Sequence, residues 1–165
     1  MESNHLKPLT VTGAVITVSS SRKPGTDTSG KTLIDLLSAA DINVAHYTVV
    51  PDDLEQIRAA VYVALSHANC LIITGGTGLT PDDCTIEAVA PLLEKKIDGF
   101  GELFRLKSYE EIGTAAILSR AIAGVIGGRV VFCIPGSTKA VALAARAIII
   151  PEIRHILTHA SAGQR

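Results

Sequence analysis

Short apolar runs alternate along the chain with stretches in which apolar residues recur every three or four positions. The runs, rich in Val and Ile, predict strands over residues 11–18, 42–50, 70–74 and 129–134. The helical spacing predicts helices over residues 31–40, 53–65, 85–93, 101–112, 139–150 and 152–159, the last two separated by Pro151. Strands that are apolar throughout are buried on both faces. The alternation therefore predicts an α/β fold, a three-layer αβα sandwich with a mostly parallel sheet.

Polar and glycine-rich segments fall where the predicted strands end. They comprise residues 19–22 after the first strand, 51–53 after the second, 75–78 after the third and 135–137 after the last. Parallel sheets of this kind bind ligands in the crevice beyond the carboxyl ends of their strands. We therefore expect the functional site at this edge of the sheet.

Composition narrows the function classes. The 165 residues are expected to form a single domain, residues 1–165, with residues 1–10 as a flexible N-terminal segment. Hydrophobic residues make up 47% and the net charge is −1, which excludes intrinsic disorder and offers no basic surface to nucleic acid. The longest apolar stretch, residues 140–150, is interrupted by Arg146 and is too short to cross a membrane. The three cysteines form neither a disulfide framework nor a zinc motif, so we expect a cytoplasmic protein.

Residues 25–32, Gly25-Thr-Asp-Thr-Ser-Gly30-Lys31-Thr32, match the P-loop pattern of nucleotide-binding proteins. Three observations count against that interpretation. About six polar residues separate the predicted strand from Gly25, Asp27 places a negative charge among the phosphate-binding amides, and no later strand ends in a metal-holding Asp. The alternative is a loop in which Thr28 or Ser29 caps the next helix.

Two other loops are better candidates for anion binding. Gly75, Gly76, Thr77 and Gly78 directly follow a buried strand, where successive backbone N–H groups form an anion-binding concavity. Gly136 and Ser137 lead straight into the next helix and offer N–H groups and a hydroxyl to a second anion, although Ser137 is equally explained as an ordinary helix cap.

Carboxylates lie beside these loops. Asp83, together with Asp52 or Asp53, would supply the oxygen ligands that Mg²⁺ prefers when it bridges phosphates, while Asp82 or Asp83 is also a candidate helix cap. Cys84 sits among these residues, and we favour a passive filler over an activated thiol.

Two features of the last helices have structural explanations. His155 and His159 lie four residues apart without the Glu of a zinc-protease motif, which favours exposed histidines over a metal site. The 140–150 helix is apolar on almost all sides, which indicates either deep burial or a subunit interface, and we expect an oligomer.

Several short motifs occur together in one order along the chain. They are Asp27-Thr-Ser-Gly30, Val50-Pro-Asp52-Asp53, Thr74-Gly-Gly-Thr-Gly78, Asp83-Cys-Thr-Ile-Glu87-Ala88, Gly99-Phe-Gly-Glu102-Leu-Phe-Arg105, Leu118-Ser-Arg120 and Ile134-Pro-Gly-Ser137. In this order they resemble the molybdopterin adenylyltransferase family, the MoaB/MogA group of molybdenum cofactor biosynthesis. The resemblance runs from about Val11 to His155, and residues 109–113 are closer to the MoaB branch.

The resemblance implies a Rossmann-like three-layer fold, a homotrimer or homohexamer, and transfer of an adenylyl group from ATP to molybdopterin with Mg²⁺. It implies that Asp52 and Asp83 are the functional carboxylates that hold Mg²⁺. It implies phosphate binding by Gly75, Gly76, Thr77, Gly78, Gly136 and Ser137, and substrate binding by Ser19, Glu102, Ser119 and Arg120. On this resemblance Lys31 has no role in the function, and its match to the P-loop pattern is accidental.

The chain departs from the family pattern at Ser20, where many relatives carry an acidic residue. A serine there alters the anion pocket, and some members of the MoaB branch are thought not to catalyse. The alternative function is therefore a catalytically silent protein that binds molybdopterin or serves as a scaffold.

Overall fold

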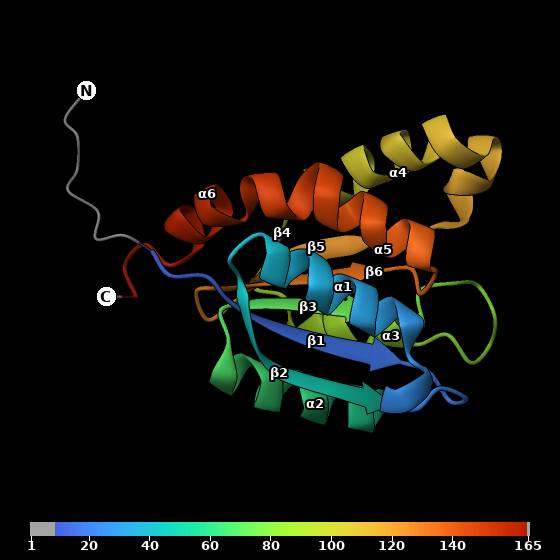
Figure 1. The fold of residues 1–165 in the computed structure, drawn as a ribbon, viewed down its shortest axis with the longest axis horizontal. Coiled ribbons are helices and arrows are strands. Elements are labelled where there is room, and N and C mark those ends of the chain that lie inside the picture. Colours follow the sequence, from blue (N-terminus) through green and yellow to red (C-terminus); the bar gives the residue numbers. More distant parts are fainter. Residues whose placement is uncertain (1–8, 165) are drawn as a thin grey trace.

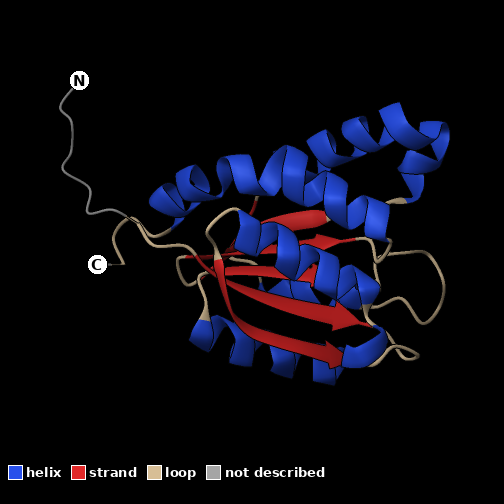
Figure 2. Cartoon of the chain, viewed as in Figure 1, coloured by secondary structure: helices blue, strands red, loops and turns tan. Residues whose placement is uncertain are grey.

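The four predicted strands are neighbours in one six-stranded sheet, whose order is β2-β1-β3-β6-β5-β4 (Figures 1 and 2). The structure is a computed structural model and describes residues 9–164. Strands β2, β1, β3 and β6 pair in parallel, β5 pairs antiparallel with β6, and the edge strand β4 pairs antiparallel with β5. The bounds are β1 Thr12–Val18, β2 Asn43–Val50, β3 Cys70–Thr74, β4 Lys95–Lys96, β5 Ile122–Ile126 and β6 Arg129–Ile134.

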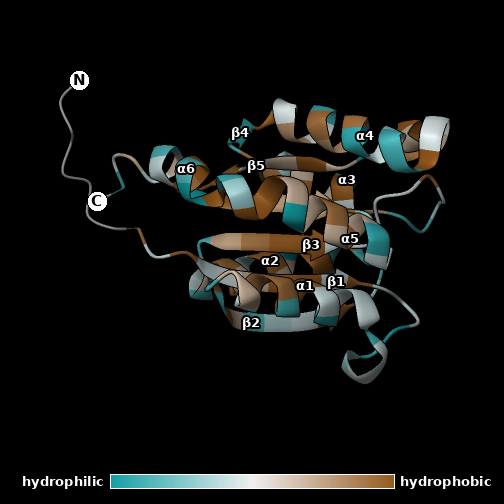
Figure 3. Ribbon diagram, turned by 45° about the horizontal axis from the view of Figure 1, so that its top comes forward, coloured by the Kyte–Doolittle hydropathy of each residue, from teal (hydrophilic) through white to brown (hydrophobic). Residues whose placement is uncertain are grey.

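Both faces of the central strands are buried because alternate side chains point to opposite faces and both sets are apolar. Ile72 and Phe132 face one layer, and Ile73 and Val131 face the other. The first layer contains α1 (Thr28–Ala39), α4 (Asp98–Ile112), α5 (Thr138–Ala144) and α6 (Ile150–Ala160). The second contains α2 (Leu54–His67) and α3 (Thr85–Val89). The prediction of a three-layer α/β fold is confirmed. Figure 3 shows β3 as hydrophobic and the edge strand β2 as much less so.

The direction in which strands are added to the sheet reverses at β1. Strand β2 lies on one side of β1, and the chain then crosses over to place β3 on the other side. Loops that leave β1 and β3 at their carboxyl ends therefore diverge to opposite sides and leave a crevice between them. Ser19 and Gly75 are the first residues of these two loops.

The C-terminal helix is continuous, and the prediction that Pro151 separates two helices was wrong. A π-helical turn, Ala145–Ile149, joins α5 to α6, and Pro151 lies in the first turn of α6. Proline lacks an N–H and its ring crowds the carbonyl four residues earlier. The wider π turn just before it removes that conflict without ending the helix.

A hairpin was missed. Strands β5 and β6 are joined by Gly127 and Gly128, which have φ values of +55° and +75°. Two glycines with positive φ form a tight turn that matches the twist of antiparallel strands. The Gly-Gly pair between two apolar runs was the available signal for this turn. Strand β5 was missed because the apolar run before the pair is short and is interrupted by Gly124.

Helix α1 begins earlier than predicted, and neither Thr28 nor Ser29 is its cap. Asp27 caps it instead, with its Oδ1 accepting the Gly30 N–H at 3.0 Å. The Asp27 carboxylate is buried and also accepts a hydrogen bond from the Tyr47 hydroxyl. A charged cap satisfies the helix amides more strongly than a hydroxyl does.

The 140–150 segment is apolar because most of it is core. Val141, Ala144, Ala145 and Ile149 have no exposed surface. Large exposed apolar side chains are concentrated elsewhere, on α4 and on the 3-10 turn that follows it, Gly113–Leu118 (η3): Leu103, Leu106, Tyr109, Ile112, Ile117 and Leu118. The homo-oligomer stays a prediction, to be measured by light scattering.

No helix within residues 9–164 is long and apolar enough to cross a membrane. The predicted flexible segment, residues 1–10, lies outside the described residues except for Leu9 and Thr10.

Candidate functional site

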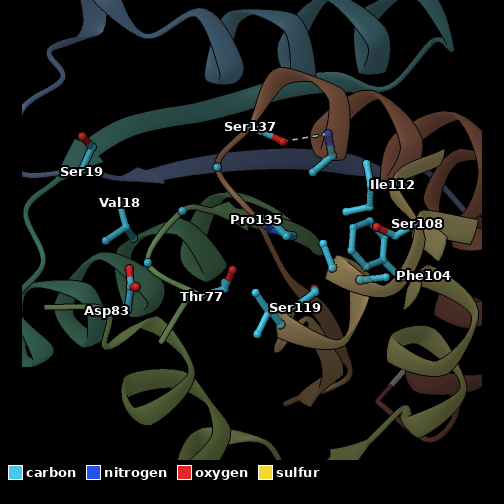
Figure 4. A pocket seen from close by; sticks show the side chains of 18 of the residues that line it. Val18, Ser19, Thr77, Asp83, Phe104, Ser108, Ile112, Ser119, Pro135 and Ser137 are labelled. Atoms are coloured by element: carbon cyan, nitrogen blue, oxygen red, sulfur yellow. Dashed lines mark hydrogen bonds between the residues drawn. The ribbon is translucent and has the colours of Figure 1, made fainter. Parts of the chain in front are cut away.

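The loops after β1, β3 and β6 surround a cavity of about 630 Å³ at the carboxyl edge of the sheet. Figure 4 shows Ser19, Thr77 and Asp83 on one side of it, and Phe104, Ser108 and Ile112 on the other. One half is thus polar and built from strand-end loops, while the other is largely apolar and built from α4 and η3. The predicted site residues that line it are Ser19, Gly75, Gly76, Thr77, Gly78, Asp83, Ser119, Gly136 and Ser137.

The loop after β3 turns sharply on two glycines. Gly75 and Gly76 have φ values of +96° and +68°. A Cβ on Gly75 would lie 2.3 Å from the Val18 carbonyl oxygen, so the two loops approach each other at backbone distance. The Gly75 N–H donates to Ile134 O at 3.0 Å, and the Thr85 hydroxyl donates to Gly75 O at 2.8 Å. The loop is therefore held in place from both sides.

Arg120 holds the same loop from behind rather than lining the cavity. Its Nε and Nη2 donate to the Gly78 carbonyl at 3.0 and 2.7 Å, and Nε also donates to Thr77 O at 3.3 Å. Its Nη1 donates to the Glu87 carboxylate, and this hydrogen bond lowers the pKa of Glu87. The geometry makes Arg120 a positioning residue for the loop carbonyls.

The loops after β1 and β6 are fixed by their own serines. Ser137 caps α5, its Oγ accepting the N–H of the third helical residue at 3.1 Å (dashed in Figure 4). Ser19 Oγ accepts the Arg22 N–H at 3.1 Å. A Cβ on Gly136 would lie 3.2 Å from the Gly75 Cα, so a side chain there would crowd the neighbouring loop. Ser137 is both an ordinary cap and a cavity residue.

The two proposed functional carboxylates each keep one oxygen without a hydrogen bond to the described residues. Asp83 Oδ2 accepts the N–H and hydroxyl of Thr80 at 3.0 and 2.8 Å. Asp52 Oδ2 accepts the Ser20 hydroxyl at 2.8 Å, and the Asp52 N–H donates back to Ser20 Oγ at 3.1 Å. Asp52 does not line the cavity. Neither Asp82 nor Asp83 caps α3, which has no side-chain cap.

Asp53 is occupied as the cap of α2, where its Oδ1 accepts the Gln56 N–H at 2.9 Å. Within residues 9–164, no group of three or more His, Cys, Asp or Glu side chains could hold a metal ion. His155 and His159 are exposed on α6, where His155 contacts the Glu152 carboxylate at 3.1 Å.

Cys84 is a thiol in a negative environment. Burial raises its pKa, and so do the negative charges of nearby carboxylates, Asp52, Glu87, Asp53 and Asp83. A raised pKa leaves less thiolate at neutral pH, so Cys84 is a poor nucleophile. The filler interpretation is the one this environment favours.

We expect iodoacetamide to alkylate Cys84 alone in the native protein, because Cys70 and Cys133 have no exposed surface. The alkylation rate at neutral pH should be below that of Cys84 in the unfolded chain, because the raised pKa leaves less thiolate. The rate should go on rising with pH beyond the range in which an ordinary thiol ionises. Mass spectrometry of labelled peptides measures this, with Cys84→Ser as the unlabelled control. Rapid labelling of Cys84 at neutral pH would contradict it.

Some predicted residues lie away from the cavity, and some cavity residues were missed. Glu102 is exposed on α4 and does not line it. Arg22, Phe104, Ser108 and Ile112 also line it, and none of them was predicted as a site residue, although Arg22 lies in the strand-end segment 19–22 and Phe104 in the motif of residues 99–105. The helical spacing of the apolar residues in α4 indicated a core face and could not show that this face ends at a cavity.

The P-loop segment does not form a phosphate-binding loop at a strand end. Residues 19–27 separate β1 from α1, Gly30 is buried inside the first turn of α1, and Lys31 is exposed outside the cavity lining. A P-loop places its glycines between strand and helix.

The chain is similar to proteins of known family. A model described as "Probable molybdopterin binding domain" matches residues 14–155. "Molybdenum cofactor biosynthesis protein B" of Staphylococcus aureus (strain COL) is 49% identical over 152 residues, 90% of each chain. A crystal structure of "Molybdenum cofactor biosynthesis protein B" matches with a TM-score of 0.90 and 46% identity, over 95% of this chain and 99% of that one. The "tungsten cofactor synthesizing protein MoaB" from Pyrococcus furiosus matches with a TM-score of 0.85 and 44% identity, over 93% and 98%.

Proposed function

This chain belongs to the MoaB family of molybdenum cofactor biosynthesis proteins, and on that premise we propose that it transfers the adenylyl group of ATP to the terminal phosphate of molybdopterin. The observation that carries the proposal is the single cavity in which three strand-end loops, an acidic residue and an apolar wall meet. Such a cavity suits two anionic groups on its polar side and a planar ring on its apolar side.

The proposed reaction needs positioning more than acid–base chemistry. An oxygen of the molybdopterin phosphate is already ionised, so it attacks the α-phosphorus of ATP without a general base. A bond forms between that oxygen and the α-phosphorus, the bond to the bridging oxygen breaks, and pyrophosphate leaves with the electron pair. The protein has to hold two anions in line and stabilise the charge that develops.

The loops of this chain are suited to that task. The loop of Gly75–Gly78 is pinned by Arg120, Thr85 and the end of β6, so its position does not have to be set during the reaction. Gly136 and Ser137 begin a helix whose N-terminus attracts negative charge. We assign the phosphates of the two substrates to these loops.

Mg²⁺ fits the carboxylates present, because Asp52 and Asp83 each leave one oxygen without a hydrogen bond to the described residues. Magnesium sites at phosphates use one or two carboxylates and take their other ligands from phosphate and water. Asp52 and Asp83 would hold the ion, which when bound neutralises phosphate charge.

A second candidate is molybdopterin binding without adenylyl transfer. The observation that favours it is the Ser20–Asp52 pair, in which a hydroxyl occupies one oxygen of a carboxylate that does not line the cavity. In that case Asp52 is a structural residue of the loop.

We expect pyrophosphate release from ATP and Mg²⁺ to require molybdopterin. A coupled pyrophosphate assay measures it, with Lys31→Ala as a control that should stay within about twofold of wild type because Lys31 is exposed outside the cavity lining. Binding of molybdopterin without release would support the second candidate. Release without any pterin, abolished by Lys31→Ala, would restore the P-loop interpretation.

A further inference from the structure

We propose that Arg22 is the fixed positive charge of the cavity and that the edge formed by its Nε and Nη2 atoms binds a phosphate group of the ligand. The proposal rests on the proposed function for the identity of the ligands, and it gives a role to a residue of the strand-end segment 19–22 that was not predicted as a site residue. The phosphate belongs either to the nucleotide or to molybdopterin, and the experiment below separates the two.

Arg22 is anchored by one nitrogen only. Its Nη1 donates to Ser29 Oγ at 3.2 Å and to Gly136 O at 3.3 Å, and lies 3.9 Å from Asp27 Oδ1. Among residues 9–164, its Nε and Nη2 make no hydrogen bond or ion pair. Guanidinium has five N–H groups, so the three on Nε and Nη2 stay available, and two of them point outward along the Nε–Nη2 edge. That edge has the geometry to bind two oxygens of a phosphate at once.

The anchoring also gives the guanidinium a defined position. Ser29 Oγ donates to Gly136 O at 2.6 Å, so the loop after β6 and the start of α1 are joined where Arg22 contacts both. At the other end of the residue, the Arg22 backbone N–H donates a hydrogen bond to Ser19 Oγ within the loop after β1. A long side chain with both ends fixed loses little further conformational entropy when it binds an anion.

Burial of Asp27 explains why a cation sits here without a ligand. The Asp27 side chain has no exposed surface, and a buried carboxylate is costly unless it is paired. Gly30 and Tyr47 donate to it, and Arg22 faces it at 3.9 Å. The Arg22 side chain itself is 39% exposed and lines the cavity, so it contacts the buried charge on one side and the ligand space on the other.

The ligands proposed for this cavity are anionic, and Arg22 supplies the positive charge that they need. Among the described residues that line it, Arg22 is the one Lys or Arg and Asp83 is the one acidic residue. Arg120, which holds the loop after β3, is engaged by loop carbonyls and by Glu87. Two phosphate-bearing ligands bring several negative charges, and a positively charged side chain lowers the cost of placing them together.

The test is calorimetric binding of pyrophosphate and, separately, of molybdopterin to wild type, Arg22→Met and Arg22→Lys. We expect Arg22→Met to weaken binding of the phosphate that Arg22 contacts by roughly 10- to 100-fold, as for the loss of a charged hydrogen-bonded pair. Arg22→Lys keeps a charge beside Asp27, and therefore the fold, but cannot form the two-nitrogen contact, so its loss should be intermediate. Weaker pyrophosphate binding assigns Arg22 to the nucleotide, and weaker molybdopterin binding assigns it to the pterin.

Lys23→Met is the matched control, because it removes the same charge from the next residue. The Lys23 side chain is exposed and does not line the cavity. It should leave both affinities within about twofold. The proposal would be overturned if Arg22→Met and Arg22→Lys both bound the two ligands within twofold of the wild-type affinities. It would also be overturned if the wild-type protein bound neither ligand at millimolar concentration. Lost binding in the Arg22 variants of a protein that releases no pyrophosphate would keep this proposal and reject adenylyl transfer.

Discussion

Replacing Asp83 by asparagine is expected to reduce molybdopterin-dependent pyrophosphate release by roughly 100-fold or more. The substitution keeps an oxygen that accepts the two hydrogen bonds from Thr80 at 3.0 and 2.8 Å, so the loop conformation should survive. The negative charge that would hold Mg²⁺ against the phosphates is lost. Initial rates measured over a range of Mg²⁺ concentrations should show a raised Mg²⁺ requirement as well as a lower maximum.

The neighbouring Asp82 provides the control for this prediction. It is exposed and absent from the cavity lining, so Asp82→Asn removes the same charge a single residue away and should leave the rate within about twofold. Equal losses in both variants would mean that only the net charge of the segment matters. An unchanged rate in Asp83→Asn would remove Asp83 from the proposed metal site and leave only the cavity to support the function.

Replacing Gly75 by alanine is expected to destabilise the protein by about 3 kcal/mol or more. The residue has a φ of +96°, which alone strains any L side chain. The new Cβ would also lie 2.3 Å from the carbonyl oxygen of Val18, at the end of a strand paired on both sides. Neither backbone segment can shift without breaking sheet hydrogen bonds, and urea denaturation would measure the loss.

Gly99→Ala is the matched control, since nothing lies within 4 Å of a Cβ at that position of α4 and its φ is ordinary. There the exchange should stabilise the fold by about 0.5 kcal/mol by restricting the unfolded chain. If Gly75→Ala were as stable as wild type, the tight turn between β1 and β3 would not be required for the fold, and the rigid-loop account of the site would fail.

The parallel half of the sheet could be predicted because its strands are continuous apolar runs, which only burial on both faces explains. Residues 70–74 and 129–134 were predicted with the bounds that β3 and β6 have. Strands β4 and β5 were not, because Lys95–Lys96 has no apolar pattern and β5, which lies between β6 and β4, is a short strand interrupted by Gly124. The continuous last helix was missed because proline is usually a helix boundary, and the compensating π turn leaves no mark in the sequence.

The strand-end position of the candidate site was predictable, but its side-chain geometry was not. Gly75–Gly78, Gly136 and Ser137 follow strands directly, so the sheet order alone brings them together. Asp27 was predicted neither as a helix cap nor as a partner of Arg22, yet it caps α1 and faces Arg22. That arrangement depends on which way buried side chains turn after the chain has folded, and no local spacing encodes it.

The two halves of the cavity differ in how freely evolution can alter them. The strand-end loops of the polar half approach one another at backbone distance, so a change in one disturbs the next. The apolar wall comes from α4 and η3, which also carry exposed apolar side chains such as Leu106 and Ile117 on their outer surface. On the proposed function, substitutions at the exposed wall residues Ile112 and Leu118 would change which ring system is accepted while the transfer chemistry stays the same. Related chains should accordingly diverge in ligand choice through residues 98–118 before they diverge in mechanism.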